Sequence, residues 1–298
     1  MFCKHSCGEA MSRSLRVFPL VGLLVLTAAK PQAQVRIATY NIRYDNPADG
    51  IHAWENRKAH VASLIRFHKI DIVCIQEALI QQVRYLKEQL AGFEYCGVGR
   101  DDGREEGEFS SIFYNTNRFE ILETNTIWLS PTPSVVSEGW DAAIVRIMTW
   151  VHFRDKQSGK QFYVFNTHFD HVGVVARKES AHLVRKFIRR IAGNRSAILA
   201  GDFDSTENDD PYKIITHQDG AAGLALKDAK MISRTPHHGS DKTFSGFDPK
   251  QGIIGDRIDY IFVTEDIGVL RHAILSEMRE EGFLSDHFPV FAEIEFSR

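Results

Sequence analysis

The sequence of 298 residues has few cysteines, no dense run of basic residues and no long apolar segment. Each of these features narrows the classes of function that the protein could have. Two of the four cysteines, Cys3 and Cys7, precede an apolar stretch near the N-terminus, so the chain lacks the disulfide framework of small secreted domains. Cys74 lies in an apolar segment and is interpreted as core filling. A disulfide bond between Cys74 and Cys96 is an open alternative, and we expect none.

The charge balance argues against a protein that binds long nucleic acids. Its formal net charge is −3, whereas such proteins concentrate Lys and Arg on one surface. The most basic stretch, RKFIRR at 185–190, is interpreted as the exposed face of an amphipathic helix. Nucleic acid is therefore a permitted substrate but not the favoured one.

The N-terminal segment is typical of a secretory signal peptide. A basic stretch at 12–16 precedes an apolar stretch at 17–28, and the polar sequence AKPQAQ follows. The apolar stretch is too short for a good membrane span, so we expect no transmembrane anchor. We assign residues 1–34 to a signal peptide cleaved near Ala33, with Met11 as an alternative start, which predicts a secreted or periplasmic protein. An uncleaved apolar N-terminal segment is the alternative.

Residues 35–298 alternate between strand-like and helical patterns without a repeat or a low-complexity linker. We expect strands at 35–42, 71–77, 93–99, 109–115, 119–129, 144–154, 161–168, 196–203, 257–263 and 287–296. We expect helices at 53–68, 79–90 and 174–192, and loops at 130–134 and 204–213. The pattern predicts one α/β domain, a four-layered sandwich of two packed mixed β-sheets flanked by helices.

Polar residues gather at the ends of these expected strands, where layered sheets commonly bind ligands. Each has an ordinary structural explanation alone, but carboxylates and histidines at the ends of five or six strands indicate a site. The residues are Asn41, Glu77, His168, Asp170, His171, Asp202, Asp204, Asp259, Asp286 and His287. Oxygen ligands favour Mg²⁺ or Mn²⁺, with Ca²⁺ as a further candidate. The histidines leave zinc open.

Six motifs in order resemble the endonuclease/exonuclease/phosphatase superfamily, which has the fold of deoxyribonuclease I. They are TYNIR at 39–43, QE at 76–77, NTHFDH at 166–171, GDFD at 201–204, RIDYIF at 257–262 and SDHFPV at 285–290. The resemblance covers residues 35–298. The stretches GRDDG at 99–103 and WDAAIVR at 140–146 further resemble a bacterial secreted branch of that family.

The resemblance implies a metal site. Glu77 is similar to the family's metal-binding glutamate, Asn41 to the asparagine that supports it, and Asp286 to an aspartate that contacts the metal or orients the next residue. Asp204 departs from the family, which usually has asparagine there. Because an ionised aspartate only accepts hydrogen bonds, Asp204 must be neutralised by a second cation, protonated or turned away from the phosphate. We favour a metal near Asp202 and Asp204 over impaired chemistry.

The resemblance also implies catalytic roles. Asp202 is similar to the residue that orients or deprotonates the attacking water, and His287 to the histidine that binds the scissile phosphate. Asp259 is similar to the aspartate that orients this histidine, and His168 to the residue that contacts the phosphate or the leaving oxygen.

Four further residues are candidates for binding the rest of the substrate. Arg104 and Arg146 are candidate cations, with a surface salt bridge as the alternative for each, and Asp170 and His171 follow His168 in NTHFDH.

The expected function is that of a metal-dependent phosphoesterase, most simply a phosphodiesterase. It would hydrolyse a nucleotide, a lipid headgroup or a sugar phosphate by in-line attack of activated water. Its partner would be a small-molecule or lipid phosphate ester, and we expect a monomer. The alternatives are a binding protein on the same scaffold, with chemistry lost through Asp204, and a nuclease with a positive groove beside the site.

Overall fold

The computed structural model describes residues 1–5, 34–218, 220, 223–251 and 255–297. The signal peptide assigned to 1–34 therefore lies almost entirely outside the described residues. The described residues from Gln34 onward form one compact unit. Among the helices described, none is long and apolar enough to cross a membrane.

Two large mixed sheets form the centre of this unit. The first has seven strands in the order β10-β12-β15-β1-β2-β4-β3, in which β1 is parallel to β2 and antiparallel to β15. Its strands are β1 (Gln34–Asn41), β2 (Ile72–Ala78), β3 (Phe93–Cys96), β4 (Phe109–Asn115), β10 (His238–Gly239), β12 (Ile267–Ile274) and β15 (Val290–Phe296).

The second sheet has six strands in the order β5-β6-β7-β8-β11-β9, and only its β7–β8 pair is parallel. Its strands are β5 (Phe119–Trp128), β6 (Ile147–Asp155), β7 (Gln161–His168), β8 (Ala197–Asp202), β9 (Leu226–Asp228) and β11 (Asp259–Thr264). A separate short ribbon pairs β13 (Met278–Arg279) with β14 (Gly282–Phe283).

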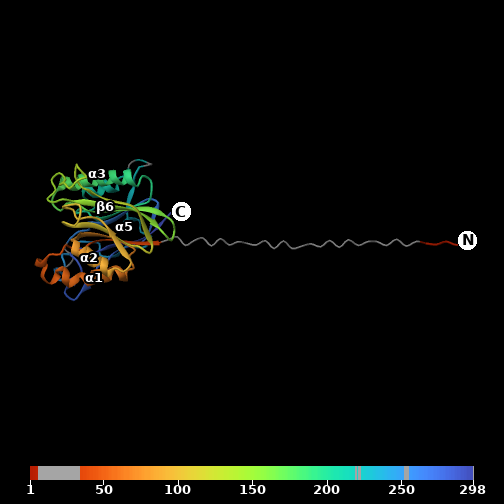
Figure 1. The fold of residues 1–298 in the computed structure, drawn as a ribbon, viewed down its shortest axis with the longest axis horizontal. Coiled ribbons are helices and arrows are strands. Elements are labelled where there is room, and N and C mark those ends of the chain that lie inside the picture. The colour runs from red at the N-terminus through yellow and green to blue at the C-terminus, as the bar shows by residue number, and fades with distance from the viewer. Residues whose placement is uncertain (6–33, 219, 221–222, 252–254, 298) are drawn as a thin grey trace. The chain divides into compact units, whose positions relative to one another are not determined.

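Helices cover the outer faces of both sheets, which completes the four layers. In Figure 1, α1 and α2 lie on one side of the paired sheets and α3 on the other. The helices are α1 (Trp54–Phe67), α2 (Ile80–Gln89), α3 (Val174–Ile191), α4 (Asp210–Thr216) and α5 (Ala229–Ile232), with 3₁₀ turns at Pro47–His52 and Pro249–Gln251.

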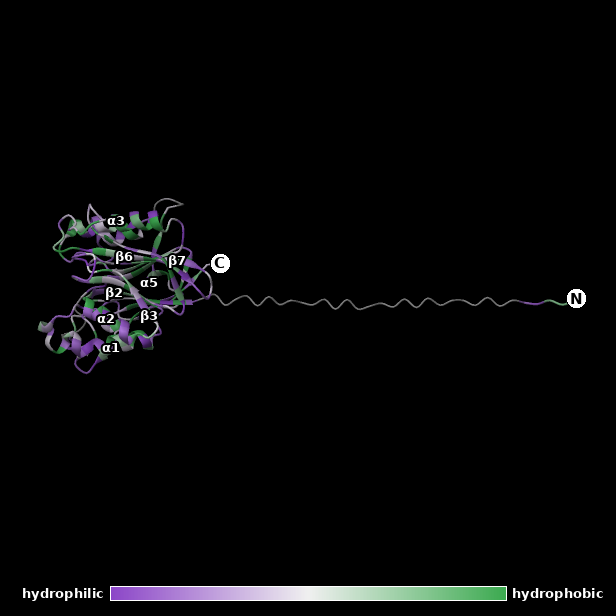
Figure 2. Ribbon diagram, viewed as in Figure 1, coloured by the Kyte–Doolittle hydropathy of each residue, from purple (hydrophilic) through white to green (hydrophobic). Residues whose placement is uncertain are grey.

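Three apolar clusters fill the three interfaces between these layers. Side chains alternate between the two faces of a strand, and β8 illustrates this: Ile198 and Ala200 join the cluster between the sheets, whereas Ala197 and Leu199 pack beneath α3. Figure 2 shows the apolar colour concentrated in the strands and on the inner sides of the helices. The predicted sandwich is confirmed.

A buried polar contact ties the two sheets together just below the strand ends. Gln76 of β2 donates from Nε2 to Asn166 Oδ1 of β7 across 2.6 Å, and Asn166 Nδ2 donates to the carbonyls of Ile75 and Ser111. Both side chains are fully buried. Gln76 Oε1 has no hydrogen-bond partner among the described residues, whereas the contacts of Asn166 hold β2, β4 and β7 in one arrangement.

Some expectations were wrong in detail. β12 was missed, and α4 lies partly inside the stretch 204–213 expected to be a loop. Arg185, assigned to an exposed basic face, is buried and donates to the carbonyls of Ile215 and Leu224. Cys74 and Cys96 are buried free thiols, as expected.

Candidate active site

Strand register places two of the candidate residues beside Asp202, the last residue of β8. Asp202 pairs with His168 of parallel β7 and with Asp259 of antiparallel β11. The preceding residue must be small, because a Cβ on Gly201 would lie 2.2 Å from the Thr167 carbonyl oxygen. The glycine of GDFD thus allows β7 and β8 to approach where the site begins.

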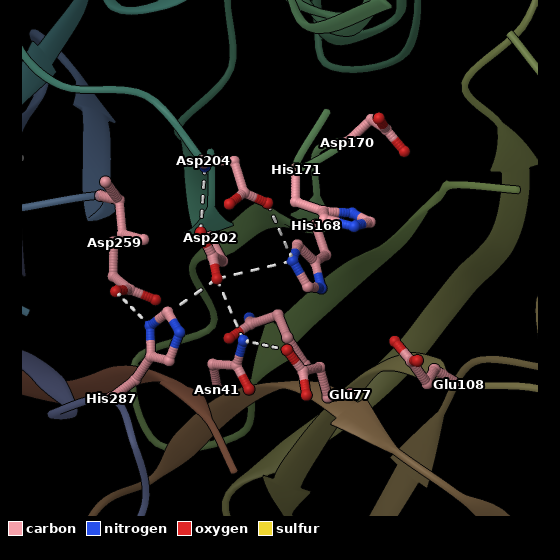
Figure 3. A network of polar contacts seen from close by, with 12 residues as sticks. Asn41, Glu77, Glu108, His168, Asp170, His171, Asp202, Asp204, Asp259 and His287 are labelled. Atoms are coloured by element: carbon pink, nitrogen blue, oxygen red, sulfur yellow. Dashed lines mark hydrogen bonds and ion pairs between the residues drawn. The ribbon is translucent and has the colours of Figure 1, made fainter. Parts of the chain in front are cut away.

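Asn41 joins the two sheets at the site. From the end of β1, its Nδ2 donates to Glu77 Oε1 at 2.9 Å and to Asp202 Oδ2 at 3.0 Å (Figure 3). Its Oδ1 accepts from the Arg43 backbone N–H at 3.0 Å. Asn41 therefore holds the two carboxylates together through its amide group, which fits a supporting residue better than a direct metal ligand.

A histidine–aspartate pair lies on one side of Asp202. His287 Nδ1 lies 2.9 Å from Asp259 Oδ2 and 3.7 Å from Asp202 Oδ2. Although burial opposes the charged form, Asp259 and Asp202 hold the pKa of His287 well above its usual value. With Nδ1 bound to Asp259, the Nε2–H of this imidazolium is left to meet an anion.

His168 lies on another side of Asp202, where it also meets Asp204. His168 Nε2 is 3.2 Å from Asp204 Oδ2 and 3.5 Å from Asp202 Oδ2. Burial and the charge of Arg146 lower the pKa of His168 to about 4, so this imidazole is neutral at pH 7. The Asp204 backbone N–H donates to Asp202 Oδ1 at 3.0 Å, which leaves Oδ2 of Asp202 facing the cavity side of the network.

The carboxylates differ in their protonation. Burial and the charges of Asp259 and Asp204 raise the pKa of Asp202 to about 7. Burial alone would raise the pKa of Glu77 as well, but the charge that His168 carries at low pH and the hydrogen bond from Asn41 lower it to about 2. A carboxylate whose pKa lies near neutral pH suits a general base, whereas a permanently ionised one suits a cation ligand.

Strained backbone also concentrates at this site. Seven non-glycine residues of the described chain have positive φ, and three of them line the same cavity: Arg43 (φ 57), Glu77 (φ 64) and Asp204 (φ 44). Each left-handed residue costs about 1–2 kcal/mol, so such residues persist where the surrounding structure requires them. Their convergence on one cavity supports a functional site there.

The cavity has a volume of about 590 Å³ and is also lined by His168, Asp202, Asp286 and His287. Asp286 Oδ2 lies 3.8 Å from Arg43 Nε, and burial raises the pKa of the Asp286 carboxyl. Other cavities of about 700 and 740 Å³ lie elsewhere and contain no comparable group of carboxylates in the described chain. The side chains that line a cavity therefore identify the candidate site, whereas cavity volume alone does not.

Of the residues expected to bind the rest of the substrate, Arg146 and His171 line the cavity, and Arg146 Nη2 lies 3.1 Å from His171 Nδ1. Asp170 does not line it: this buried carboxylate accepts the backbone N–H groups of Ala143, Val172 and Gly173 and lies apart from the network in Figure 3. Its Oδ2 is 3.6 Å from Arg146 Nε, so it positions the arginine.

The structure does not bring Arg104 to the cavity. Its side chain is exposed on the 99–108 loop and is not among the residues that line the cavity. The sequence reasoning also missed Arg43 and Glu108, which do line it. Arg43 belongs to the TYNIR motif, two residues after Asn41, and its place in that motif was the available signal.

The donor set fits a hard divalent cation. Two groups of three side chains place one potential ligand atom each within 4.8 Å of one another: His168 with Asp202 and Asp204, and Asp202 with Asp259 and His287. Oδ1 of Asp259 is buried without a hydrogen-bond partner among the described residues. Carboxylate oxygens predominate, as magnesium or manganese prefers. The first group contains Asp204, the departure from the family pattern.

Comparisons with known proteins agree with this geometry. The family model described as Endonuclease/Exonuclease/phosphatase family matches residues 38–287. A family member from Bacteroides vulgatus is 42% identical with a TM-score of 0.84, covering 89% of this chain and 100% of that one. A mannosyl-6-phosphatase from Bacteroides thetaiotaomicron is 38% identical with a TM-score of 0.80, covering 88% of this chain and 100% of that one.

Similarity to curated proteins is more distant. Nocturnin from Drosophila melanogaster is 23% identical over 284 residues, which cover 81% of this chain and 42% of that protein. The chain spans less than two thirds of the length of the first curated relatives that it matches.

Proposed function

The chain belongs to the endonuclease/exonuclease/phosphatase family, and from this membership we propose that it is a metal-dependent phosphoric ester hydrolase acting on phosphate esters of small sugars. The observation that carries the proposal is the position of Asp202. One of its carboxylate oxygens faces Asn41, His168 and His287 within 3.7 Å, in a cavity also lined by Glu77.

The residues share three tasks, and Asp202 takes part in two of them. Glu77, Asp286 and the group of His168, Asp202 and Asp204 are the candidates to hold the metal, which supplies positive charge to the phosphoryl and leaving oxygens. Oδ2 of Asp202 accepts the proton of the attacking water. Nε2–H of His287, kept cationic by Asp259, donates to a phosphoryl oxygen and stabilises its developing charge.

Two observations support a sugar phosphate as the substrate class. The mannosyl-6-phosphatase aligns over 88% of this chain at 38% identity. The cavity is lined by several carboxylates beside two arginines, which suits one small polar ester better than a polyanionic strand. A phosphodiester substrate, the expectation from the sequence alone, is the second candidate, since curated relatives include exoribonuclease subunits.

Hydrolysis of model esters tests the proposal. The purified protein is assayed with p-nitrophenyl phosphate, bis(p-nitrophenyl) phosphate and a panel of hexose phosphates, with Mg²⁺, Mn²⁺ or Ca²⁺ and with EDTA. We expect EDTA-sensitive release of phosphate from a hexose monophosphate. Preference for the diester would support the second candidate, and no turnover with any metal would support a binding protein.

We also propose that the protein is secreted or periplasmic, on the basis of the basic and apolar pattern at 12–28. N-terminal sequencing of protein recovered from cell fractions tests this. A mature N-terminus near residue 34 in the periplasmic or extracellular fraction is the expected result, and an intact N-terminus in the cytoplasmic fraction would contradict it.

A further inference from the structure

We infer that Glu108, held by Arg100, is a specificity residue that accepts hydrogen bonds from hydroxyl groups of the leaving alcohol. This inference rests on the proposed function. It places the leaving alcohol against a wall of the cavity that the catalytic residues do not form.

Glu108 and Arg100 form a rigid pair in the cavity wall. Arg100 Nη1 donates to Glu108 Oε2 at 2.7 Å, and the two side chains are only 13% and 17% exposed. The Arg100 backbone N–H donates to the Glu108 carbonyl, and Trp128 Nε1 donates to the Arg100 carbonyl at 2.9 Å. Backbone contacts therefore fix both residues before any ligand binds.

This pair has unused hydrogen-bonding capacity. Arg100 occupies Oε2 of Glu108, whereas Oε1 has no hydrogen-bond partner among the residues that the structure describes. Glu108 lines the same cavity as the catalytic residues. When ionised, the carboxylate can only accept hydrogen bonds, so Oε1 is the atom that can accept from a ligand in the cavity.

The position of Glu108 matches the path of a leaving group. Figure 3 shows Asp259, His287 and Asp202 on one side of the site and Glu108 on the opposite side, beyond Glu77. In a phosphoryl transfer the attacking and leaving oxygens are roughly in line. If Asp202 directs the water, the alcohol leaves on the far side, toward Glu77 and Glu108.

Hydroxyl groups are the partners that suit this position. The hydroxyl groups of a sugar donate hydrogen bonds that a carboxylate oxygen accepts. A second phosphate would be repelled by the negative charge of Glu108. A hydrogen bond to a charged group contributes about 1.5–3 kcal/mol, which corresponds to about tenfold to a hundredfold in kcat/KM. p-Nitrophenol carries no such hydroxyl, so its ester serves as the reference substrate.

The test compares Glu108→Gln with Glu106→Gln, a matched change at an exposed position on the same loop. For each protein, kcat/KM is measured at pH 8 for a hexose phosphate and for p-nitrophenyl phosphate. We expect the ratio of the two values to fall at least tenfold in Glu108→Gln and to stay unchanged in Glu106→Gln. An unchanged ratio in Glu108→Gln overturns the inference and leaves the proposed function intact.

Monodeoxy analogues of the hexose phosphate provide a second test, and its first comparison uses only the unaltered protein. One analogue should lose at least tenfold in kcat/KM with the unaltered protein, and that loss should disappear in Glu108→Gln. If no analogue loses activity, Glu108 does not accept from the sugar. If the unaltered protein hydrolyses p-nitrophenyl phosphate but no hexose phosphate, the proposed substrate class fails and this inference fails with it.

Discussion

His168 Nε2 lies 3.2 Å from Asp204 Oδ2, so the carboxylate that stands where the resemblance predicts asparagine faces a candidate catalytic histidine. Asp204 also lines the cavity, which excludes an orientation away from the site. Burial raises the pKa of the Asp204 carboxyl, yet His168 and Asp202 lie close enough to share a cation with it. A metal held partly by Asp204 is the explanation that uses all three side chains.

Asp204→Asn tests this role. We expect kcat/KM to fall by about tenfold or more and the Mg²⁺ concentration for half-maximal rate to rise, because losing one anionic ligand weakens cation binding. The measurement is the initial rate against metal concentration. Raised turnover in Asp204→Asn would instead mean that the natural aspartate impairs the chemistry.

Asp259→Asn should remove the charge that keeps His287 cationic. We expect kcat to fall by about 10²–10⁴-fold, the range associated with one acid–base group, because the imidazole loses both its orientation and its proton. The pH–rate profile should also lose activity at a lower pH than in the unaltered protein. Asp241→Asn, at an exposed carboxylate, is the control, and equal kcat in the two variants would refute the role.

We expect KM to depend on Arg146 but not on Arg104. Arg146→Lys should raise KM about tenfold to a hundredfold, since lysine cannot reproduce the planar guanidinium between His171 and Asp170. Arg104→Ala should leave KM unchanged because its side chain is exposed away from the cavity. Thermal unfolding of both variants checks that the fold is intact. A large effect of Arg104→Ala would restore the expectation drawn from the sequence.

His272, outside the site, predicts a pH-dependent stability. Burial and the charges of Arg257 and His237 lower its pKa from 6.5 to about 2. His272 is therefore neutral in the folded protein, whereas its unfolded form gains a proton below pH 6.5. The contribution to stability is complete above pH 6.5 and is lost as pH falls toward 2.

The loss attributable to His272 is about 2 kcal/mol at pH 5. Urea unfolding at pH 7.5 and pH 5 measures it, with His272→Gln as the comparison. The free energy of unfolding of the unaltered protein should fall by about 2 kcal/mol more than that of the variant. Equal falls in both proteins would show that His272 takes up its proton without unfolding.

The sequence predicted the main strands because their apolar runs are long and end in turn residues. β12 was not predicted because Arg271 and His272 interrupt its apolar pattern and a bulge between Val269 and Arg271 shifts its register. α4 was not predicted because its first residues, Asp210 followed by proline, are typical of a turn. Short or irregular elements are held by tertiary contacts that one sequence does not display.

The candidate site was predictable where motifs end strands, as with Asp202 and His287. Glu108 was not, because it precedes β4 and only the return of the 99–108 loop brings it to the cavity. The separate roles of Asp170 and Arg146 also required the structure, since both lie in quoted motifs but only Arg146 lines the cavity.

The most direct test of a metal-dependent hydrolase with Asp202 as its base is phosphate release from a hexose monophosphate by the unaltered protein and by Asp202→Asn, each with Mg²⁺ and with EDTA. We expect turnover that EDTA abolishes and that Asp202→Asn reduces by about 10²–10⁴-fold. Turnover that survives both EDTA and Asp202→Asn would contradict this expectation.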